Sequence, residues 1–249
     1  MNQDNIKIIY EDRNLIVIDK PAGLVVHPGA GEHTKTLVDW FLDRYPESKK
    51  LLWPDLTRPG IIHRLDKDTS GLMFLAKNPE ALIKMQALFQ SRKIKKTYLA
   101  LVFGKLEKPE GDISGFIGRN PNARHQQTAK SIHFDFQPGK VREAKTYYKV
   151  LKEYHFNSET LSLVEVVIET GRMHQIRVHF KSIGHPLIGD PIYNIKHSKR
   201  ISKELGLNRQ FLHAYKLEFT NPFANKIMKF ESTLPSELQK ILTTNTHNT

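Results

Sequence analysis

The sequence predicts an α+β fold with a central, mainly antiparallel β-sheet. Short runs rich in β-branched and aromatic residues outnumber the segments with helical spacing. These strand candidates do not alternate regularly with long helices, as they would in a doubly wound parallel sheet. Hydrophobic residues make up 39% of the chain and aromatic residues 9%, which is sufficient for a folded core.

The first 76 residues contain strand candidates on both sides of a helix. Residues 6–10 and 15–20 are β-rich runs separated by a polar turn. A helix is expected over residues 36–44, where apolar side chains recur at helical spacing. Residues 60–65 and 72–76 are expected to be extended, so the turn-rich segment between them should be a loop between strands.

The remaining elements follow from the same signals. A second helix is expected after Asn78 as N-cap and Pro79 as first helical residue, and a third between Gly171 and Gly184. The segment 111–139 is polar and is expected to be exposed connecting structure. Further strands are expected over residues 97–102, 146–150, 161–168 and 211–219, and a last short helix over 234–242.

Charge and composition narrow the class of protein. The chain has 38 Lys and Arg against 26 Asp and Glu, a net charge of +12, which favours nucleic acid or anionic lipid as partner over a basic surface kept for solubility. It has no cysteine, which excludes disulfides and thiolate metal sites. No apolar run approaches the ~20 residues of a membrane span. Residues 1–5 resemble neither a secretory signal nor a transit peptide, so we expect a cytoplasmic protein.

The densest cluster of reactive side chains is residues 63–71, His-Arg-Leu-Asp-Lys-Asp-Thr-Ser-Gly. Its opening from Asp66 matches a calcium-binding EF-hand loop, but Lys77 stands where that loop requires a bidentate glutamate, which argues against calcium. In an arbitrary loop, Asp66 and Asp68 would be turn formers that accept hydrogen bonds from backbone amides. Spacing alone leaves turn formation and catalysis open.

An ordered set of motifs surrounds this cluster. It consists of residues 20–28 (Lys-Pro-Ala-Gly-Leu-Val-Val-His-Pro), 60–72, 96–100 (Lys-Thr-Tyr-Leu-Ala), 171–179 (Gly-Arg-Met-His-Gln-Ile-Arg-Val-His), 184–193 and 212–214 (Leu-His-Ala). In this order the motifs resemble those of RluA-type pseudouridine synthases over roughly residues 10–235. The resemblance implies the α+β catalytic fold of that family with a basic cleft, and isomerisation of uridine to pseudouridine in RNA without a cofactor.

The resemblance also implies roles for three side chains. Asp66 would be the catalytic carboxylate, Tyr98 the active-site tyrosine and Arg177 the arginine that pairs with Asp66. Asp66 must be ionised in a site dry enough to hold a detached uracil, and a guanidinium would offset the cost of burying that charge. The competing interpretations are core packing for Tyr98 and a surface position for Arg177.

RNA binding should involve further basic residues. Because structured RNA hides the target base, the base must be extruded, and the resemblance favours Arg64 as the side chain that fills the gap. His63 and Arg64 could instead position the phosphodiester backbone. The remaining RNA-binding candidates are Arg92, Lys93, Lys95, Lys96, Arg172 and His174, with Lys199, Arg200 and Lys203 as a second basic patch.

No metal is expected. His174 and His179 are five residues apart, a spacing that suits neither one helix face nor a zinc pair. We therefore expect both histidines to have structural roles. The third-motif position of His174 nevertheless makes it an RNA-binding candidate.

We expect a single catalytic domain over residues 1–249, with its core at about 10–235 and a frayed C-terminal tail. Many ribosomal members of the RluA-type family carry an S4 RNA-binding domain, which we do not expect here. The expected protein is a monomeric isomerase acting on structured RNA, first large-subunit (23S) ribosomal RNA and second transfer RNA. The alternative is a non-catalytic RNA-binding or ribosome-assembly factor.

Overall fold

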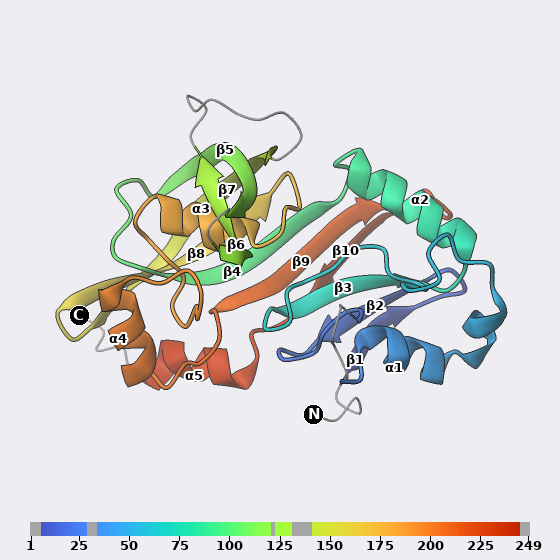
Figure 1. Cartoon of the computed structure of the whole chain (residues 1–249), viewed down its shortest axis with the longest axis horizontal. Coiled ribbons are helices and arrows are strands. Elements are labelled where there is room, and N and C mark those ends of the chain that lie inside the picture. Colours follow the sequence, from blue (N-terminus) through green and yellow to red (C-terminus); the bar gives the residue numbers. More distant parts are fainter. Residues whose placement is uncertain (1–5, 29–33, 121–122, 131–140, 245–249) are drawn as a thin grey trace. The chain divides into compact units, whose positions relative to one another are not determined.

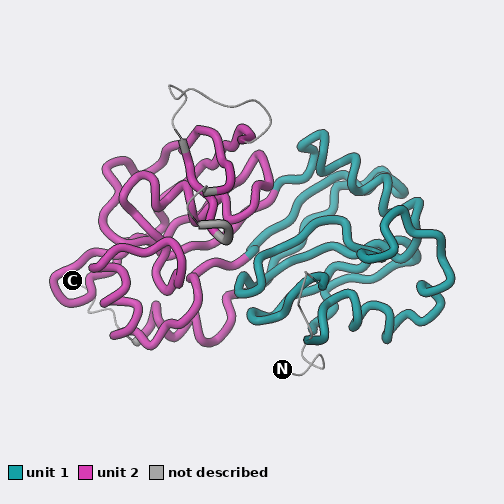
Figure 2. The backbone as a smooth tube through the Cα atoms, in the orientation of Figure 1, with its two compact units in different colours: residues 1–95, 214–233 teal, residues 96–213, 234–249 magenta. Residues whose placement is uncertain are grey.

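The structure is a computed structural model that describes residues 6–28, 34–120, 123–130 and 141–244 (Figure 1). Its backbone divides into two compact units (Figure 2). Unit 1 comprises residues 1–95 and 214–233, and unit 2 comprises 96–213 and 234–249. Each unit therefore combines segments that are far apart in the sequence. The single catalytic domain stays a prediction, since compactness by itself does not define a folding unit.

Unit 1 is built on a β-sheet. Its strands are β1 Lys7–Glu11, β2 Leu15–Lys20, β3 Ser70–Ala76, β9 Leu212–Thr220 and β10 Ile227–Glu231. They run in the order β1-β2-β3-β9, with β10 paired to β9. The pairs β1–β2, β2–β3 and β9–β10 are antiparallel.

The helices of unit 1 begin where their capping residues predict. They are α1 Leu37–Arg44, the 3-10 helix η2 Pro46–Lys50 and α2 Pro79–Gln90. Thr36 caps α1 in a capping box, because its hydroxyl accepts from the N–H of Asp39 while the Asp39 carboxylate accepts from the N–H of Thr36. Asn78 caps α2 by accepting from the N–H of Ala81. Both helices were predicted, α1 from the helical spacing of its apolar side chains and α2 from Asn78 and Pro79.

Aromatic rings fill the core of unit 1 beside β3. Phe74 meets Phe89, Phe219 and Phe230 edge-on, with ring centroids 6.3, 5.0 and 6.4 Å apart. Such edge-to-face contacts add to the stabilisation from burying the rings. They fix β3 directly after the turn that carries Asp66.

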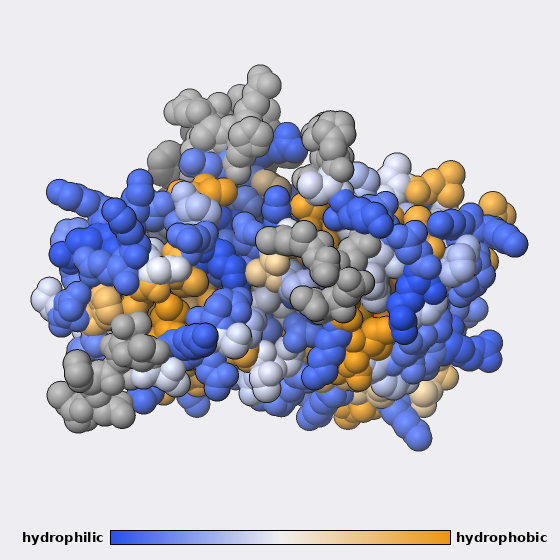
Figure 3. Space-filling model, turned by 90° about the horizontal axis from the view of Figure 1, so that it is seen from below, coloured by the Kyte–Doolittle hydropathy of each residue, from blue (hydrophilic) through white to orange (hydrophobic). Residues whose placement is uncertain are grey.

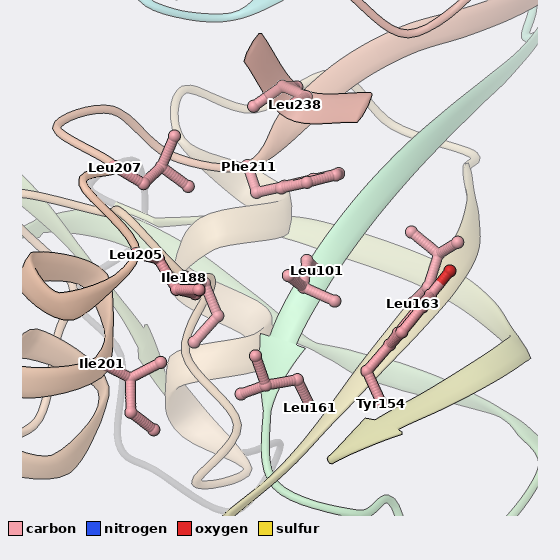
Figure 4. Close-up of a cluster of buried hydrophobic side chains, with 10 residues drawn as sticks. All are labelled: Leu101, Tyr154, Leu161, Leu163, Ile188, Ile201, Leu205, Leu207, Phe211 and Leu238. Atoms are coloured by element: carbon pink, nitrogen blue, oxygen red, sulfur yellow. The ribbon is translucent and has the colours of Figure 1, made fainter. Parts of the chain in front are cut away.

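Unit 2 contains the remaining strands, whose pairs are also antiparallel. These are β4 Lys95–Phe103, β5 Glu110–Asn120, β6 Ala123–Lys130, β7 Val141–Phe156 and β8 Glu159–Ile168, in the order β4-β8-β7-β5-β6. Its helices are α3 Gln175–Ser182, α4 Lys196–Glu204 and α5 Ser236–Thr244. A cluster of buried side chains from strands, helices and loops forms its core, including Leu101, Leu161, Ile201, Phe211 and Leu238 (Figure 4).

The predicted α+β class with a mainly antiparallel sheet is confirmed, but the prediction of exposed connecting structure from residue 111 onwards was wrong. Within residues 111–130 the chain forms β5 and β6 instead of exposed connecting structure, while 131–140 lie outside the described residues. The reason is visible in β5, where Ile113 and Ile117 are buried at strand spacing with a glycine between them. β7 is also 16 residues long, well beyond the strand expected over 146–150.

Among the described residues, no helix is both long and apolar enough to span a membrane. On the face drawn in Figure 3, hydrophilic side chains predominate and the hydrophobic ones form smaller patches between them. The N-terminal segment 1–5 and the tail 245–249, for which expectations were stated, lie outside the described residues.

Candidate active site

Asp66 lies on a turn that leads into β3. Its carbonyl oxygen accepts a hydrogen bond from the N–H of Thr69 at 3.1 Å, and its side chain is half-buried. The predicted loop is therefore confirmed. The segment before it is not a strand, however, since it contributes an isolated bridge from Ile61 to Leu75.

A buried lysine holds this turn. Lys20 is 0% exposed, and its ammonium donates to the carbonyl oxygens of Pro21, Leu24 and Lys67 at 2.9, 3.0 and 2.9 Å. The N–H of Gly23 donates to the same Lys67 oxygen at 2.9 Å. The first motif, residues 20–28, thus fixes the residue that directly follows Asp66. Lys20 was not among the predicted site residues; a lysine at the end of the largely apolar run 15–20 was the available signal.

Gly71 packs the motif of residues 212–214 against the end of the Asp66 turn. Its φ is +113°, and a side chain on it would collide with the backbone of Ala214 on β9. Only glycine combines this conformation with such a close approach. Residues of three motifs that are distant in sequence therefore meet around the Asp66 turn within unit 1.

The two residues ahead of Leu65 have different surroundings. His63 Nε2 accepts from the N–H of Phe74 at 3.0 Å, and its ring stacks on Phe89 at 4.5 Å, so His63 fixes the motif to the core. Arg64 is exposed, and its Nη1 lies 3.0 Å from Nε2 of His27. The exposure of Arg64 suits a side chain that contacts RNA.

In unit 2, Arg177 on α3 is 3% exposed, so the competing interpretation of Arg177 as a surface residue was wrong. Its Nε and Nη2 donate to the two carboxylate oxygens of Asp190 at 2.7 and 2.9 Å. Its guanidinium carbon also lies 5.1 Å from the ring centroid of Tyr193. Asp190 was not among the predicted site residues, although it belongs to the motif 184–193.

Hydrogen bonds also order the segment before α3. The Tyr193 hydroxyl accepts from the N–H of Gln127 at 2.6 Å and lies 2.9 Å from Nδ1 of His174, to which it can donate. The N–H of Arg172 donates to Oε1 of Gln175 at 3.0 Å, and its Nε donates to the carbonyl of Glu143 at 3.1 Å. His174 has φ +57°, so α3 begins directly after a residue in the left-handed conformation.

The other candidates differ in exposure. Tyr98 lies on β4 opposite Val166 and is 8% exposed. This burial is compatible with both core packing and stacking on uracil, so its role stays a prediction. Arg92, Lys93 and Lys95 are exposed, whereas Lys96 is 6% exposed and does not belong to their surface. The second patch, Lys199, Arg200 and Lys203, lies exposed on α4.

The three predicted catalytic residues belong to different units. Asp66 lies in unit 1, and Tyr98 and Arg177 lie in unit 2. Their convergence, including the pairing of Asp66 with Arg177, stays a prediction. Within the described part of the chain, no group of three or more His, Asp or Glu side chains could hold a metal ion.

Comparison with protein families matches residues 14–182 to the RNA pseudouridylate synthase family. The chain belongs to this family. It is 44% identical over 239 residues to ribosomal large subunit pseudouridine synthase D of Nitrosomonas europaea, covering 95% of this chain and 64% of that protein. It is 39% identical over 244 residues to the synthase D of Pseudomonas aeruginosa, covering 95% and 71% respectively. The chain thus spans about two thirds of the length of these relatives.

Solved structures agree with this family. Human RNA pseudouridylate synthase domain containing 4 superposes with a TM-score of 0.70 and 27% identity, covering 94% of this chain and 91% of that one. Human RNA pseudouridylate synthase domain containing 1 gives a TM-score of 0.74 at 24% identity, over 94% and 86%, and supports the fold alone.

Proposed function

We propose that this chain is an RluA-type RNA pseudouridine synthase that isomerises uridine in large-subunit ribosomal RNA, with Asp66 as its catalytic carboxylate. The observation that carries the proposal is the family match over residues 14–182, which contains Asp66 and the segment from Lys20 that holds its turn. The names of the bacterial relatives support ribosomal RNA as the substrate.

In the proposed reaction, the N1–C1′ bond of uridine breaks, the trapped uracil turns, and a C5–C1′ bond forms. The proton lost from C5 is balanced by one gained at N1, so the reaction consumes nothing. A carboxylate suits this chemistry because it can attack or stabilise an electron-poor carbon and leave again. Attack at C1′, attack at C6 and removal of a 2′ proton all remain compatible with Asp66.

Tyr98 and Arg177 support Asp66 in this proposal. Tyr98 would offer an aromatic face for the uracil and a phenol that relays a proton at C5. Arg177 would keep the carboxylate of Asp66 charged. Its bonds to Asp190 use two of the five N–H donors of a guanidinium, so they are compatible with a second carboxylate partner.

The test is to incubate the purified protein with unmodified ribosomal RNA in the presence of a chelator and to map pseudouridine. We expect a product that Asp66→Ala and Asp66→Asn abolish, while Asp66→Asn retains RNA affinity. The control is Asp43→Asn, which changes an exposed carboxylate on α1 that pairs with Lys35 and Lys49.

Each other outcome of this test has a distinct meaning. Full product from Asp66→Ala would refute the catalytic carboxylate. Product in transfer RNA alone would replace the proposed substrate. RNA binding without any product from the native protein would favour a non-catalytic RNA-binding factor.

The proposal extends to location and assembly. We propose a cytoplasmic location, which suits a ribosomal substrate. A monomer would suffice, because each chain carries Asp66, Tyr98 and Arg177. Cell fractionation and light scattering of the purified protein test these two points.

A further inference from the structure

His27 is a buried histidine of the first motif that has no assigned chemical role. It is 8% exposed, and its two ring nitrogens have different neighbours. Nδ1 lies 3.2 Å from the carbonyl oxygen of Pro28, and Nε2 lies 3.0 Å from Nη1 of Arg64. Because Arg64 is exposed, His27 joins the interior of unit 1 to a side chain at its surface.

These neighbours specify one form of the imidazole ring. A carbonyl oxygen can only accept, so Nδ1 carries the proton that is donated to Pro28. A guanidinium can only donate, so Nε2 must be the unprotonated acceptor for Arg64. Both contacts are satisfied by a single neutral tautomer, whereas a doubly protonated ring would place an N–H against the N–H of Arg64.

We propose that His27 is a positioning residue that, as a neutral imidazole, holds the guanidinium of Arg64 in the orientation in which it contacts RNA. The inference rests on the proposed function, in which Arg64 fills the gap left by the extruded base. A long arginine side chain loses conformational freedom when it inserts into RNA, and a hydrogen bond formed beforehand reduces that loss on binding.

The surroundings of His27 keep it neutral near pH 7. Burial is the largest cause that lowers the pKa of His27, and the positive charges of Arg64 and Arg58 lower it further. The hydrogen bond to Pro28 and the charge of Asp55 act in the opposite direction. Protonation in acid would repel Arg64 from the ring and release it.

The geometry can be tested without any activity. Nitrogen NMR of the full chain with labelled histidine should show His27 protonated at Nδ1 alone. Its titration midpoint should rise in Arg64→Ala, because a nearby positive charge is removed, and stay constant in Arg13→Ala, which removes an exposed arginine of the β1–β2 turn. The opposite tautomer, or a midpoint insensitive to Arg64, would overturn the proposal.

The functional consequence is tested by pseudouridine formation under single-turnover conditions. His27→Phe keeps a ring but removes the acceptor, and it should slow the reaction roughly tenfold, as expected for one charge-assisted hydrogen bond. The double variant His27→Phe/Arg64→Ala should be no slower than Arg64→Ala alone. His27→Gln, which supplies a neutral acceptor, should restore the rate and reduce the loss of rate that we expect the native protein to show in acid.

Thermal melting of each variant separates unfolding from misplacement of Arg64. Additive losses in the double variant, or an acid profile unchanged in His27→Gln, would contradict the positioning role. If the native protein forms no pseudouridine in any RNA, the proposed function fails, while the NMR coupling still decides the relation between His27 and Arg64.

Discussion

Arg177 and Asp190 form an ion pair at which both side chains are almost fully withdrawn from solvent, 4% and 0% exposed. The Asp190 carboxylate also accepts from the backbone N–H groups of Ile192 and Tyr193 at 2.8 and 2.9 Å. Removing two charges from water costs free energy. In this pair the cost is offset by the bidentate geometry and by the backbone hydrogen bonds to the Asp190 carboxylate. Removing one partner leaves the other as an uncompensated buried charge.

We therefore predict that Arg177→Lys lowers the free energy of unfolding by about 3 kcal/mol, since an ammonium cannot replace both hydrogen bonds to Asp190. Chemical denaturation measures this loss. The control is Arg177→Met/Asp190→Leu, which removes both charges and should be more stable than Arg177→Met alone. Equal stability of native and Arg177→Lys proteins would contradict the proposed importance of the bidentate geometry.

The buried side chain of His179 makes the free energy of unfolding depend on pH. It is 0% exposed, its Nδ1 lies 2.9 Å from Oγ1 of Thr146, and burial lowers its pKa to about 4. The unfolded chain, in which a histidine has a pKa near 6.5, binds the proton first as the pH falls. Stability from this group is complete above that value and is lost as the pH falls from 6.5 towards 4.

We predict that this loss amounts to roughly 3 kcal/mol for His179 once the pH is below 4. Denaturation measured at several pH values should show it in the native protein and in His155→Gln, where the substituted histidine is exposed. His179→Phe should remove the contribution of this group and leave a smaller dependence, to which His27 with its lowered pKa also contributes. An unchanged slope in His179→Phe would show that other groups cause it.

At the scale of elements, the end of β2 and the turn before β3 act as one structural piece because Lys20 joins them. Its ammonium has three backbone carbonyl partners, one of them next to Asp66 in the chain. Met is similar in length but cannot donate, so Lys20→Met would remove the ammonium from all three carbonyl oxygens, including the buried oxygen of Leu24. The Lys67 oxygen would keep the N–H of Gly23 as its donor.

We predict that Lys20→Met destabilises unit 1 by more than about 2 kcal/mol and reduces pseudouridine formation more than its melting temperature accounts for. The matched control is Lys7→Met, at an exposed lysine of β1. Activity measured well below the melting transition separates the two effects. A Lys20→Met protein with normal activity would show that the turn keeps its geometry without this lysine.

Elements were predictable where local chemistry defines them. Thr36 and Asn78 cap α1 and α2 with hydrogen bonds to residues three positions on, so their signals lie within one turn. β5 was missed because Gly115 interrupts an alternation that Ile113 and Ile117 carry. The expected first apolar residue of α3, Met173, precedes the helix and is 44% exposed.

For the whole molecule, the net charge of +12 bears on RNA affinity. The two exposed basic patches have different electrostatic surroundings. Lys93 lies just before β4 and Lys95 is its first residue. On α4, in contrast, the side chain of Arg200 pairs with Glu159 at 3.1 Å and with Glu204 at 4.0 Å. Neighbouring carboxylates weaken the positive potential around α4, so the first patch should attract phosphates more strongly.

The logarithm of RNA affinity should fall as the logarithm of salt concentration rises. We predict that Lys93→Ala/Lys95→Ala makes this negative slope shallower by about 1 to 2, because fewer counterions are released on binding. Lys199→Ala/Lys203→Ala removes the same net charge and should change the slope less. Filter binding across a salt series measures both. Equal slopes for the two variants would show that net charge, not its location, determines affinity.

The sequence by itself determined the α+β class, the starts of α1 and α2, and the family, because caps, periodicity and ordered motifs are recorded in neighbouring residues. Tertiary structure alone decided the partners of the functional side chains. Arg64 meets His27 across 37 residues, Lys20 meets Lys67 across 47, and Arg177 meets Asp190 across 13. Such hydrogen bonds depend on how distant segments pack, and no local pattern specifies that packing.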